Sequence, residues 1–324
     1  MYAELPAMSF ISALLVLVPL PWHWRAGTIP TIAITFWLFL GNLINGVNAV
    51  VWSDNVRIVS PVWCDIATKL MIGMNISLPC SLLCLCMHLE RVSSMRMVQT
   101  TVADKRRRQA WDSFLCFFVP VIYMALHYIV QGHRFDIIEH FGCRPAIYNS
   151  LASLFLIWIP PLLFSIGAGI FSAVALHHFF VRRITFARHL QTKNSALTAS
   201  HYFRLMSMSL VQIFWGVLVT GVNMWFTMKN GLRPWTGWAD IHVGFSRIGQ
   251  FPQLLISPTT WSYTYGLWWT IPISSILFFA FFSFGQEAMK QYHSCFRWVK
   301  TAVLRMPESN KFPSAMDKLG SLPS

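Results

Sequence analysis

Charged residues are scarce in this sequence. Only 11% of its 324 residues are Asp, Glu, Lys or Arg, whereas 55% are hydrophobic. A soluble protein of this length needs far more charge to keep its surface hydrated, so the composition indicates a polytopic membrane protein. The net charge of +13 would suit a nucleic-acid partner. However, the basic residues lie in short loops between long apolar runs, which is the pattern of membrane topology, and no nucleic-acid partner is expected.

Motifs for catalysis, cofactors and metals are also missing. The sequence contains no HExxH, GxSxG or CxxC string and no cluster of histidines with the spacing of metal ligands. No lysine lies between residues 262 and 284, which excludes a retinal Schiff base in the last predicted span. Acids in mid-membrane and internal repeats, which are common in transporters, are absent as well. We therefore expect neither an enzyme nor a bound cofactor or metal.

Cysteines are too few for a disulfide scaffold, since there are seven in the whole chain. Cys64 lies at the outer end of the third predicted span, and Cys143 lies in the next outer loop. The other five lie in membrane or inner positions, where thiols stay reduced. We predict a disulfide between Cys64 and Cys143, with two unpaired thiols as the alternative. Cys295, in a predicted interfacial helix, is either palmitoylated or simply buried.

Long apolar runs, by contrast, recur along the chain, and each suits the ~20 residues of a membrane-spanning helix. They lie at residues 6–22, 29–51, 65–89, 111–131, 150–181, 203–228 and 263–284. Basic residues follow the first run and do not precede it, so it is read as a retained span and not a signal peptide. Eighteen of the 25 Lys and Arg residues fall on one side, which places the N-terminus outside and the C-terminus in the cytoplasm.

The fold class that follows is an all-α integral membrane protein with a seven-transmembrane helix bundle. We assign residues 1–284 to this bundle, 285–306 to an amphipathic juxtamembrane helix and 307–324 to a short disordered tail. Residues 62–91 form the expected central helix, which runs from Cys64 outside to Arg91 inside. Within it, Asp65 and Lys69 stand in the favourable order for an i,i+4 ion pair, with Lys69 reaching outward.

Two further patterns lie inside the predicted spans. Asn42, Asn45 and Asn48 form one stripe on the second span, and we expect it to face other helices. The stripe is either interhelical glue or a switch that rearranges with state. Prolines inside the spans free backbone carbonyls that packed neighbours can satisfy, and they permit kinks. These prolines are Pro79, Pro120, Pro160, Pro161 and Pro272.

Five strings in register resemble one protein family. They are LPWHWRAGT (residues 20–28), PVWCDIATKL (61–70), HYIVQGHRFDI (127–137), YFRLM (202–206) and WADIHVGFSRIGQFP (238–252). Together they resemble the fungal pheromone mating receptors for prenylated peptides, which are class D G-protein-coupled receptors, and in particular the basidiomycete mating-type branch. The resemblance extends over about residues 6–300. HLER replaces the DRY string of rhodopsin-like receptors at the end of the third span, and no NPxxY string occurs.

The resemblance implies a farnesylated, carboxyl-methylated peptide pheromone as agonist, a heterotrimeric G protein inside and a place in the plasma membrane. Under this interpretation the protein also contacts membrane lipid and a second copy of itself in a homodimer. Candidate ligand-binding residues lie in the outer loops, where several could instead hold the loops together. They are His133, Arg134, Asp136, Glu139, Trp235, Trp238, Asp240, His242 and Arg247. The competing interpretations are a seven-helix transporter or channel for a small solute and a membrane enzyme that acts on lipid.

The basic inner segments suit docking to a G protein, although stop-transfer charges and contacts with anionic lipid would look the same. We expect the inner ends of the third, fifth and sixth spans to rearrange on activation, with the basic run after the third span in support. The candidate G-protein-facing residues are Arg91, Lys105, Arg106, Arg107, Arg108, Arg182, Arg183 and Arg204.

Overall fold

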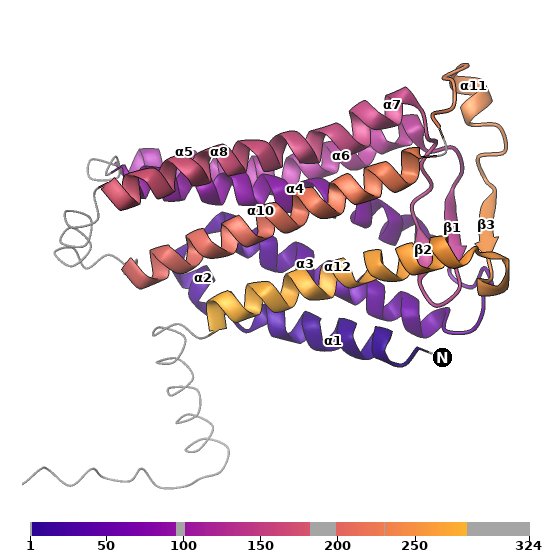
Figure 1. Cartoon of the computed structure of the whole chain (residues 1–324), viewed down its shortest axis with the longest axis horizontal. Coiled ribbons are helices and arrows are strands. Elements are labelled where there is room, and N and C mark those ends of the chain that lie inside the picture. Colours follow the sequence, from indigo (N-terminus) through magenta and orange to yellow (C-terminus); the bar gives the residue numbers. More distant parts are fainter. Residues whose placement is uncertain (1, 95–100, 182–198, 230, 284–324) are drawn as a thin grey trace, which may run out of the picture. The chain divides into compact units, whose positions relative to one another are not determined.

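Helices occupy all seven predicted spans, as far as the structure describes them. The computed structural model describes residues 2–94, 101–181, 199–229 and 231–283. Six helices or helical runs in this part are long and apolar enough to cross a membrane, and the shorter α1 followed by α2 occupies the first predicted span (Figure 1). In order they are α1 (Glu4–Leu17), α2 (Leu20–Ala26), α3 (Ile29–Val51), α4 (Pro61–Ser93), Val102–Val130, Leu151–Val181, α10 (Ala199–Met228) and α12 (Pro258–Ser283). The predicted helix at 285–306 and tail at 307–324 lie outside the described residues.

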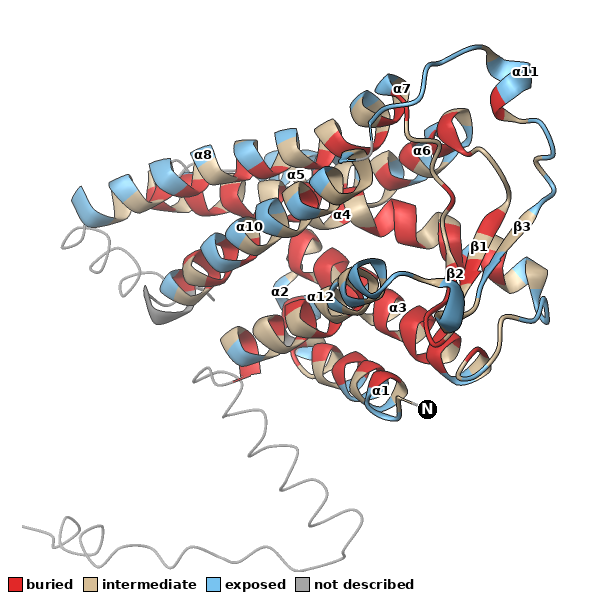
Figure 2. Ribbon diagram, turned by 45° about the vertical axis from the view of Figure 1, so that its right-hand side comes forward, coloured by how far each residue is buried: buried red, intermediate tan, exposed pale blue. Residues whose placement is uncertain are grey.

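Helix α4 is the central helix, as the sequence predicted. Within its most apolar window 72% of the residues are buried, against 28% for the runs Val102–Val130 and Leu151–Val181. It packs against α3, α6, α8 and α10, and Figure 2 shows many buried residues on α3 and α4. The outer faces of the remaining spans carry exposed apolar side chains, which suits contact with lipid.

Two of the membrane runs change helix type just before a proline. The first run passes from α5 (Val102–Ser113) through the π-helix η2 (Phe114–Phe118) to α6 (Val119–Leu126) and the 3₁₀ turn η3 (His127–Val130). The second passes from α7 (Leu151–Ser153) through the π-helix η4 (Leu154–Trp158) to α8 (Ile159–Val181). A π-turn widens the helix, and such turns accompany kinks where the regular hydrogen-bond ladder is interrupted.

Donors from neighbouring helices satisfy the carbonyls that these prolines free. Proline has no N–H, so the carbonyl four residues earlier loses its helical partner. The carbonyl of Cys116, four residues before Pro120, accepts the Trp37 indole N–H at 3.0 Å. In the same way the carbonyl of Ile157, four residues before Pro161, accepts the Tyr123 hydroxyl at 2.6 Å. The expectation that packed neighbours re-satisfy the freed carbonyls is therefore confirmed at these two positions.

The asparagine stripe on α3 is fully buried, as predicted. The Asn42 amide donates to the Ser275 hydroxyl on α12 at 2.7 Å. The Asn48 side-chain oxygen Oδ1 accepts the Trp63 indole N–H at 2.9 Å, which ties α3 to α4. Asn42 and Asn48 thus join α3 to two other helices, in line with the role of interhelical glue, whereas the buried Asn45 amide has no hydrogen-bond partner in the described part of the chain.

A small sheet covers the end of the bundle that carries Cys64, which we call the outer end. It consists of β1 (Phe135–Ile138), β2 (Gly142–Arg144) and β3 (Ile248–Phe251), in the order β2-β1-β3. Strands β1 and β2 pair antiparallel, whereas β1 and β3 pair parallel although they are far apart in the sequence. This sheet was not predicted from the sequence. Together with α11 (Trp238–Ile241) and the turn η5 (Gln253–Leu255), it forms what we call the outer cap.

Candidate functional site

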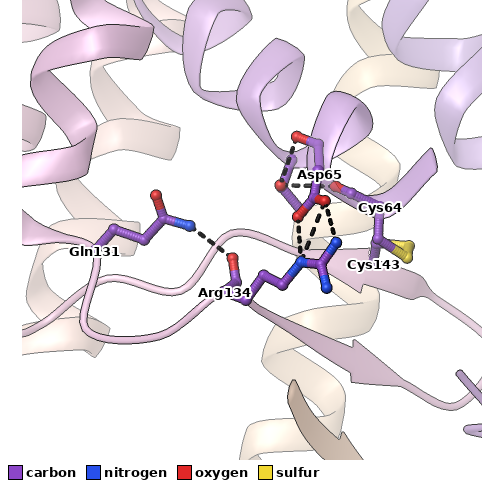
Figure 3. Close-up of polar contacts among 6 residues, drawn as sticks. Cys64, Asp65, Gln131, Arg134 and Cys143 are labelled. Carbon is purple, nitrogen blue, oxygen red and sulfur yellow. Dashed lines mark hydrogen bonds and ion pairs between the residues drawn. A yellow bond between two sulfur atoms is a disulfide. The ribbon is translucent and has the colours of Figure 1, made fainter. Parts of the chain in front are cut away.

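The outer cap is fastened to the central helix by the predicted disulfide. Cys64 in the first turns of α4 is bonded to Cys143 on β2, with their Cα atoms 5.3 Å apart (Figure 3). Both residues are fully buried in a cluster with Trp52, Phe135 and Ile137. Among the described cysteines, Cys80, Cys84, Cys86 and Cys116 are free and buried. Cys295 lies outside the described residues.

Asp65 binds Arg134 instead of the predicted Lys69. The Arg134 Nε–H donates to Asp65 Oδ1 at 2.9 Å, and Nη2–H donates to Oδ2 at 2.5 Å (Figure 3). This two-point hydrogen bonding to Asp65 raises the pKa of the Arg134 guanidinium above its ordinary value. The prediction of an Asp65–Lys69 pair was wrong because the i,i+4 rule considers only neighbours on the same helix. A guanidinium from the cap supplies two parallel donors, which a single ammonium cannot do.

Lys69 belongs to a second polar group beneath the cap. Its ammonium donates to Gln131 Oε1 at 2.6 Å and lies 3.0 Å from His127 Nδ1. An ammonium can only donate, so His127 Nδ1 accepts and its Nε2–H donates to the Ala146 carbonyl at 3.1 Å. The Gln131 amide in turn donates to the Arg134 carbonyl at 2.6 Å. Lys69 therefore helps to fix the start of the loop that carries β1 and β2.

Three of the predicted ligand residues, His133, Asp136 and Arg247, contact one another, and Glu139 binds the backbone of the second outer loop. His133 Nε2 lies 2.6 Å from Asp136 Oδ1, and Arg247 Nη2 lies 3.5 Å from His133 Nδ1. The Glu139 carboxylate accepts the Gln253 backbone N–H at 2.7 Å. Together with Arg134, these residues hold the two outer loops against each other, which is the alternative role that the sequence left open. Their contact with a ligand stays a prediction.

The remaining predicted ligand residues lie around α11. Trp238 and His242 stack with ring centroids 4.2 Å apart, and His242 also packs on Tyr128 at 5.2 Å. Trp235 and Asp240 are exposed. The structure thus divides the predicted set into a group at the sheet, around Asp136, and an aromatic group at α11. Ligand contact by the second group is likewise still a prediction.

A cavity of about 240 Å³ lies between α4, α8 with η4, α10 and α12, next to the chain that leaves β2. Its length along α10 from Gln212 to Asn223 is roughly 16 Å at ~1.5 Å per residue. The walls are mainly apolar, with polar side chains placed among them. These polar side chains are Asn75, Arg144, Ser165, Gln212, Thr220, Asn223, Thr270 and Ser274. The sequence reading identified none of them as site residues, because they come from five segments and share no motif.

Arg144 is the one charged side chain among the residues that line this cavity. Its Nε and Nη2 atoms are buried and have no hydrogen-bond partner within the described part of the chain. Its Cζ atom lies 6.0 Å from the centroid of the Phe141 ring, a cation–π contact. Burial lowers the pKa of the Arg144 guanidinium to about 10, so the group is still charged at neutral pH.

The opposite, inner end of the bundle carries a second cavity, of about 470 Å³, between α4 and α5. Of the predicted G-protein-facing residues, Arg91, Arg107 and Arg108 line it. Lys105 lines a neighbouring cavity of about 340 Å³ beside the α2–α3 turn, where Arg108 also lies. Arg106 is exposed and lines neither of these two cavities.

The remaining predicted G-protein-facing residues do not line the inner cavities or lie outside the described residues. Arg204 on α10 is half-buried and does not line the two inner cavities. Arg182 and Arg183 lie outside the described residues. In the HLER string Glu90 is buried whereas Arg91 is exposed. No His, Cys, Asp or Glu side chains come together in groups of three that could hold a metal ion, as far as residues 2–94, 101–181, 199–229 and 231–283 are concerned.

Within the described residues the chain has six membrane-length helical runs and the shorter α1 and α2 in the first predicted span. With the outer cap, the cavity beneath it and the basic inner face, this is the architecture of a seven-transmembrane membrane protein of the receptor class. The chain belongs to the STE3 pheromone A receptor family, whose family model matches residues 4–302. Family membership confirms the sequence-based resemblance and favours a receptor over an enzyme, a transporter or a channel.

Individual relatives agree with this assignment. The chain is 47% identical over its whole length to the pheromone B beta 1 receptor of Schizophyllum commune and covers 60% of that protein. It is 30% identical over 90% of its length to pheromone receptor 1 of Mycosarcoma maydis, with 82% of that receptor covered. It is 25% identical over 90% of its length to the pheromone a factor receptor of Saccharomyces cerevisiae, with 61% covered. The chain spans 47–60% of the length of the Schizophyllum commune receptors that it matches.

Proposed function

We propose that this protein is a G-protein-coupled receptor in the plasma membrane for a farnesylated, carboxyl-methylated peptide pheromone. The family match over residues 4–302 carries the proposal. The cavity beneath the outer cap supports it, because it offers a mainly apolar space with a few polar groups, as ligand sites do. At about 240 Å³ it is smaller than the ~300–1,000 Å³ of most ligand pockets, so it suits part of a lipopeptide.

The lipid and the peptide contribute differently to recognition in this proposal. A prenyl chain gains ~0.8 kcal/mol for each buried CH₂ group when it dissolves in the bilayer, so it gains little more by moving into the receptor. The prenyl chain therefore concentrates the ligand at the membrane, and the peptide part discriminates between pheromones. The polar lining of the cavity and the cap residues around Asp136 and Trp238 are the surfaces on which the peptide would be read.

Agonist binding must favour an active arrangement over the resting one, since a ligand shifts an equilibrium only by its differential affinity. The inner cavity between α4 and α5 is the proposed contact for the G protein, with Arg91 and Arg107 on its walls. Membrane lipid and a second copy of the chain are further partners in this proposal.

The function is tested by expressing the protein in yeast cells that carry a pheromone-pathway reporter and lack their own receptor. Farnesylated, carboxyl-methylated synthetic peptides should activate the reporter, and the same peptides without the farnesyl group should be weaker by orders of magnitude. Deletion of the Gα subunit should abolish the response. Solute flux that persists without a G protein, together with no response to any lipidated peptide, would instead support a transporter.

The inner face is tested with charge-neutralising substitutions. Arg91→Gln and Arg107→Gln should lower the maximal response at equal surface expression, because both side chains line the inner cavity. Arg106→Gln is the matched control, since it removes a charge from the same basic run outside both inner cavities. Equal responses from all three variants and the wild type would exclude the proposed contact.

A further inference from the structure

Arg144 lines the cavity of about 240 Å³ beneath the outer cap, which we call the outer cavity, and two of its N–H donors there have no acceptor among the described residues. An arginine can form two parallel hydrogen bonds from Nε–H and Nη2–H to one planar acceptor. In Arg144 both of these nitrogens are buried and unpaired within the described residues. No Asp or Glu is among the side chains that line this cavity. A buried charge without a partner destabilises the protein, so its presence calls for a reason other than folding stability.

The acid nearest to Arg144 by strand register does not compensate it. Asp136 on β1 stands opposite Arg144 on β2, and such cross-strand neighbours are close enough to interact. The Asp136 carboxylate is instead 2.6 Å from His133 Nε2. The two ion pairs among the described residues, His133–Asp136 and Arg134–Asp65, therefore leave Arg144 out.

Arg134 shows which chemical group the Nε–H and Nη2–H donors of an arginine bind in this protein. Arg134 uses Nε–H and Nη2–H, the two groups that are unpaired in Arg144, to hold the two oxygens of the Asp65 carboxylate. The two arginines are ten residues apart, at either end of the β1–β2 hairpin. Arg134 is paired with a carboxylate of the chain itself, whereas Arg144 lines a cavity whose lining side chains, among the described residues, include no carboxylate.

We propose that Arg144 binds a carboxylate of the peptide ligand through Nε–H and Nη2–H, in the outer cavity. This inference rests on the proposed function and names an acidic side chain, Asp or Glu, as the ligand group that is read. Arg144 is then a specificity-determining residue, because a peptide with a neutral group at that place would leave its donors unpaired. A buried polar group left without its partner is a strong basis for rejecting a ligand.

The test uses pairs of farnesylated, carboxyl-methylated peptides in which each acid is replaced by its amide, Glu by Gln or Asp by Asn. For at least one acidic position, the amide peptide should need a tenfold or higher concentration for half-maximal response in the wild type. Arg144→Gln should impose the same loss on the acid peptide and no further loss on the amide peptide. Losses that multiply, or an active peptide without any acid, would overturn the proposal.

A matched control separates this role from a general effect of losing an outer arginine. Arg233→Gln removes a guanidinium that lies 5.9 Å over the Tyr148 ring, a contact similar to that of Arg144 with Phe141. Arg233 is exposed and does not line the outer cavity. Its substitution should leave the responses to both peptides of a pair unchanged.

Two measurements on the purified receptor do not depend on signalling. Without ligand, Arg144→Met should melt at the same temperature as the wild type or higher, because an unpaired charge is removed. A lower melting temperature would reveal a structural role and overturn the proposal. Acid peptides should raise the melting temperature of the wild type more than their amide counterparts. If acid peptides stabilise the wild type more but the reporter does not respond, the proposed receptor function fails while the carboxylate site stands. Equal stabilisation by the acid and amide peptides overturns the carboxylate site.

Discussion

The disulfide between Cys64 and Cys143 should account for a measurable part of the stability of the outer cap. The two cysteines are 79 residues apart in the sequence. Closing a fully disordered loop of that length corresponds to ~4.5 kcal/mol in the chain-entropy treatment. In a membrane the intervening helices persist after the cap unfolds, so the free segment shrinks to the stretch from Gln131 to Cys143. For about 12 residues the same treatment gives ~3 kcal/mol.

The perturbation is Cys64→Ala combined with Cys143→Ala, and the assay is thermal unfolding of the purified protein in detergent. At roughly 2–4 °C for each kcal/mol in larger domains, a loss of ~3 kcal/mol lowers the melting temperature by about 6–12 °C. Each single substitution should cost about as much as the pair, because either one removes the whole bond. Reducing agent should lower the wild type by a similar amount and leave the variants unaffected.

Two other patterns of melting temperature would contradict this prediction. Single substitutions whose effects add in the double variant would mean that the two cysteines act separately, through packing in their buried cluster. A loss above ~4 kcal/mol would mean that the helices between them also separate on unfolding. Maleimide labelling of both thiols in the folded, non-reduced protein would show that the disulfide does not form.

Two further predictions concern polar contacts in the bundle. Trp37→Phe should lower the free energy of unfolding by about 1 kcal/mol, because the Cys116 carbonyl loses its donor. In a Pro120→Ala background the loss should be smaller, because the backbone N–H of residue 120 can then donate to the same carbonyl. Equal losses in both backgrounds would contradict this. Asp65→Asn should couple with Arg134→Gln by up to about 1 kcal/mol, since both side chains are about a third exposed. Losses that simply add in the double variant would contradict this pairing. Melting curves of the single and double variants measure both.

The sequence predicted the spans well because apolar length is a local property. The second span was placed at 29–51, and α3 has these same bounds. The third was placed at 65–89, whereas α4 extends from Pro61 to Ser93. The helix is longer than its apolar run because its polar ends lie at the interface, where helical backbone continues to satisfy its own hydrogen bonds. Likewise, the run at 111–131 begins earlier, at the Thr101 capping box.

The cap and the cavity could not be predicted in the same way, because they depend on contacts between distant segments. Strands β1 and β3 have four residues each and pair across more than a hundred residues of chain, so neither has a period that identifies it alone. Asp65 has a cation four residues away and another 69 residues away, and only the fold reveals that the distant one binds. Arg134 and Arg144 look alike in the sequence, as two outer basic residues. Their difference lies in what surrounds each guanidinium.

The parallel pairing of β1 with β3 has a consequence for how the protein is made. Strand β1 leaves the ribosome about 113 residues before β3, which is roughly 6–20 s at ordinary rates of synthesis. During that interval the β1 edge has no partner on that side, although the disulfide to α4 can already form. An unpaired edge invites pairing with other chains. The cap is thus completed only after the sixth helix has been inserted and just before the seventh, and substitutions in β3 should reduce yield during biogenesis more than they reduce the stability of molecules that have matured.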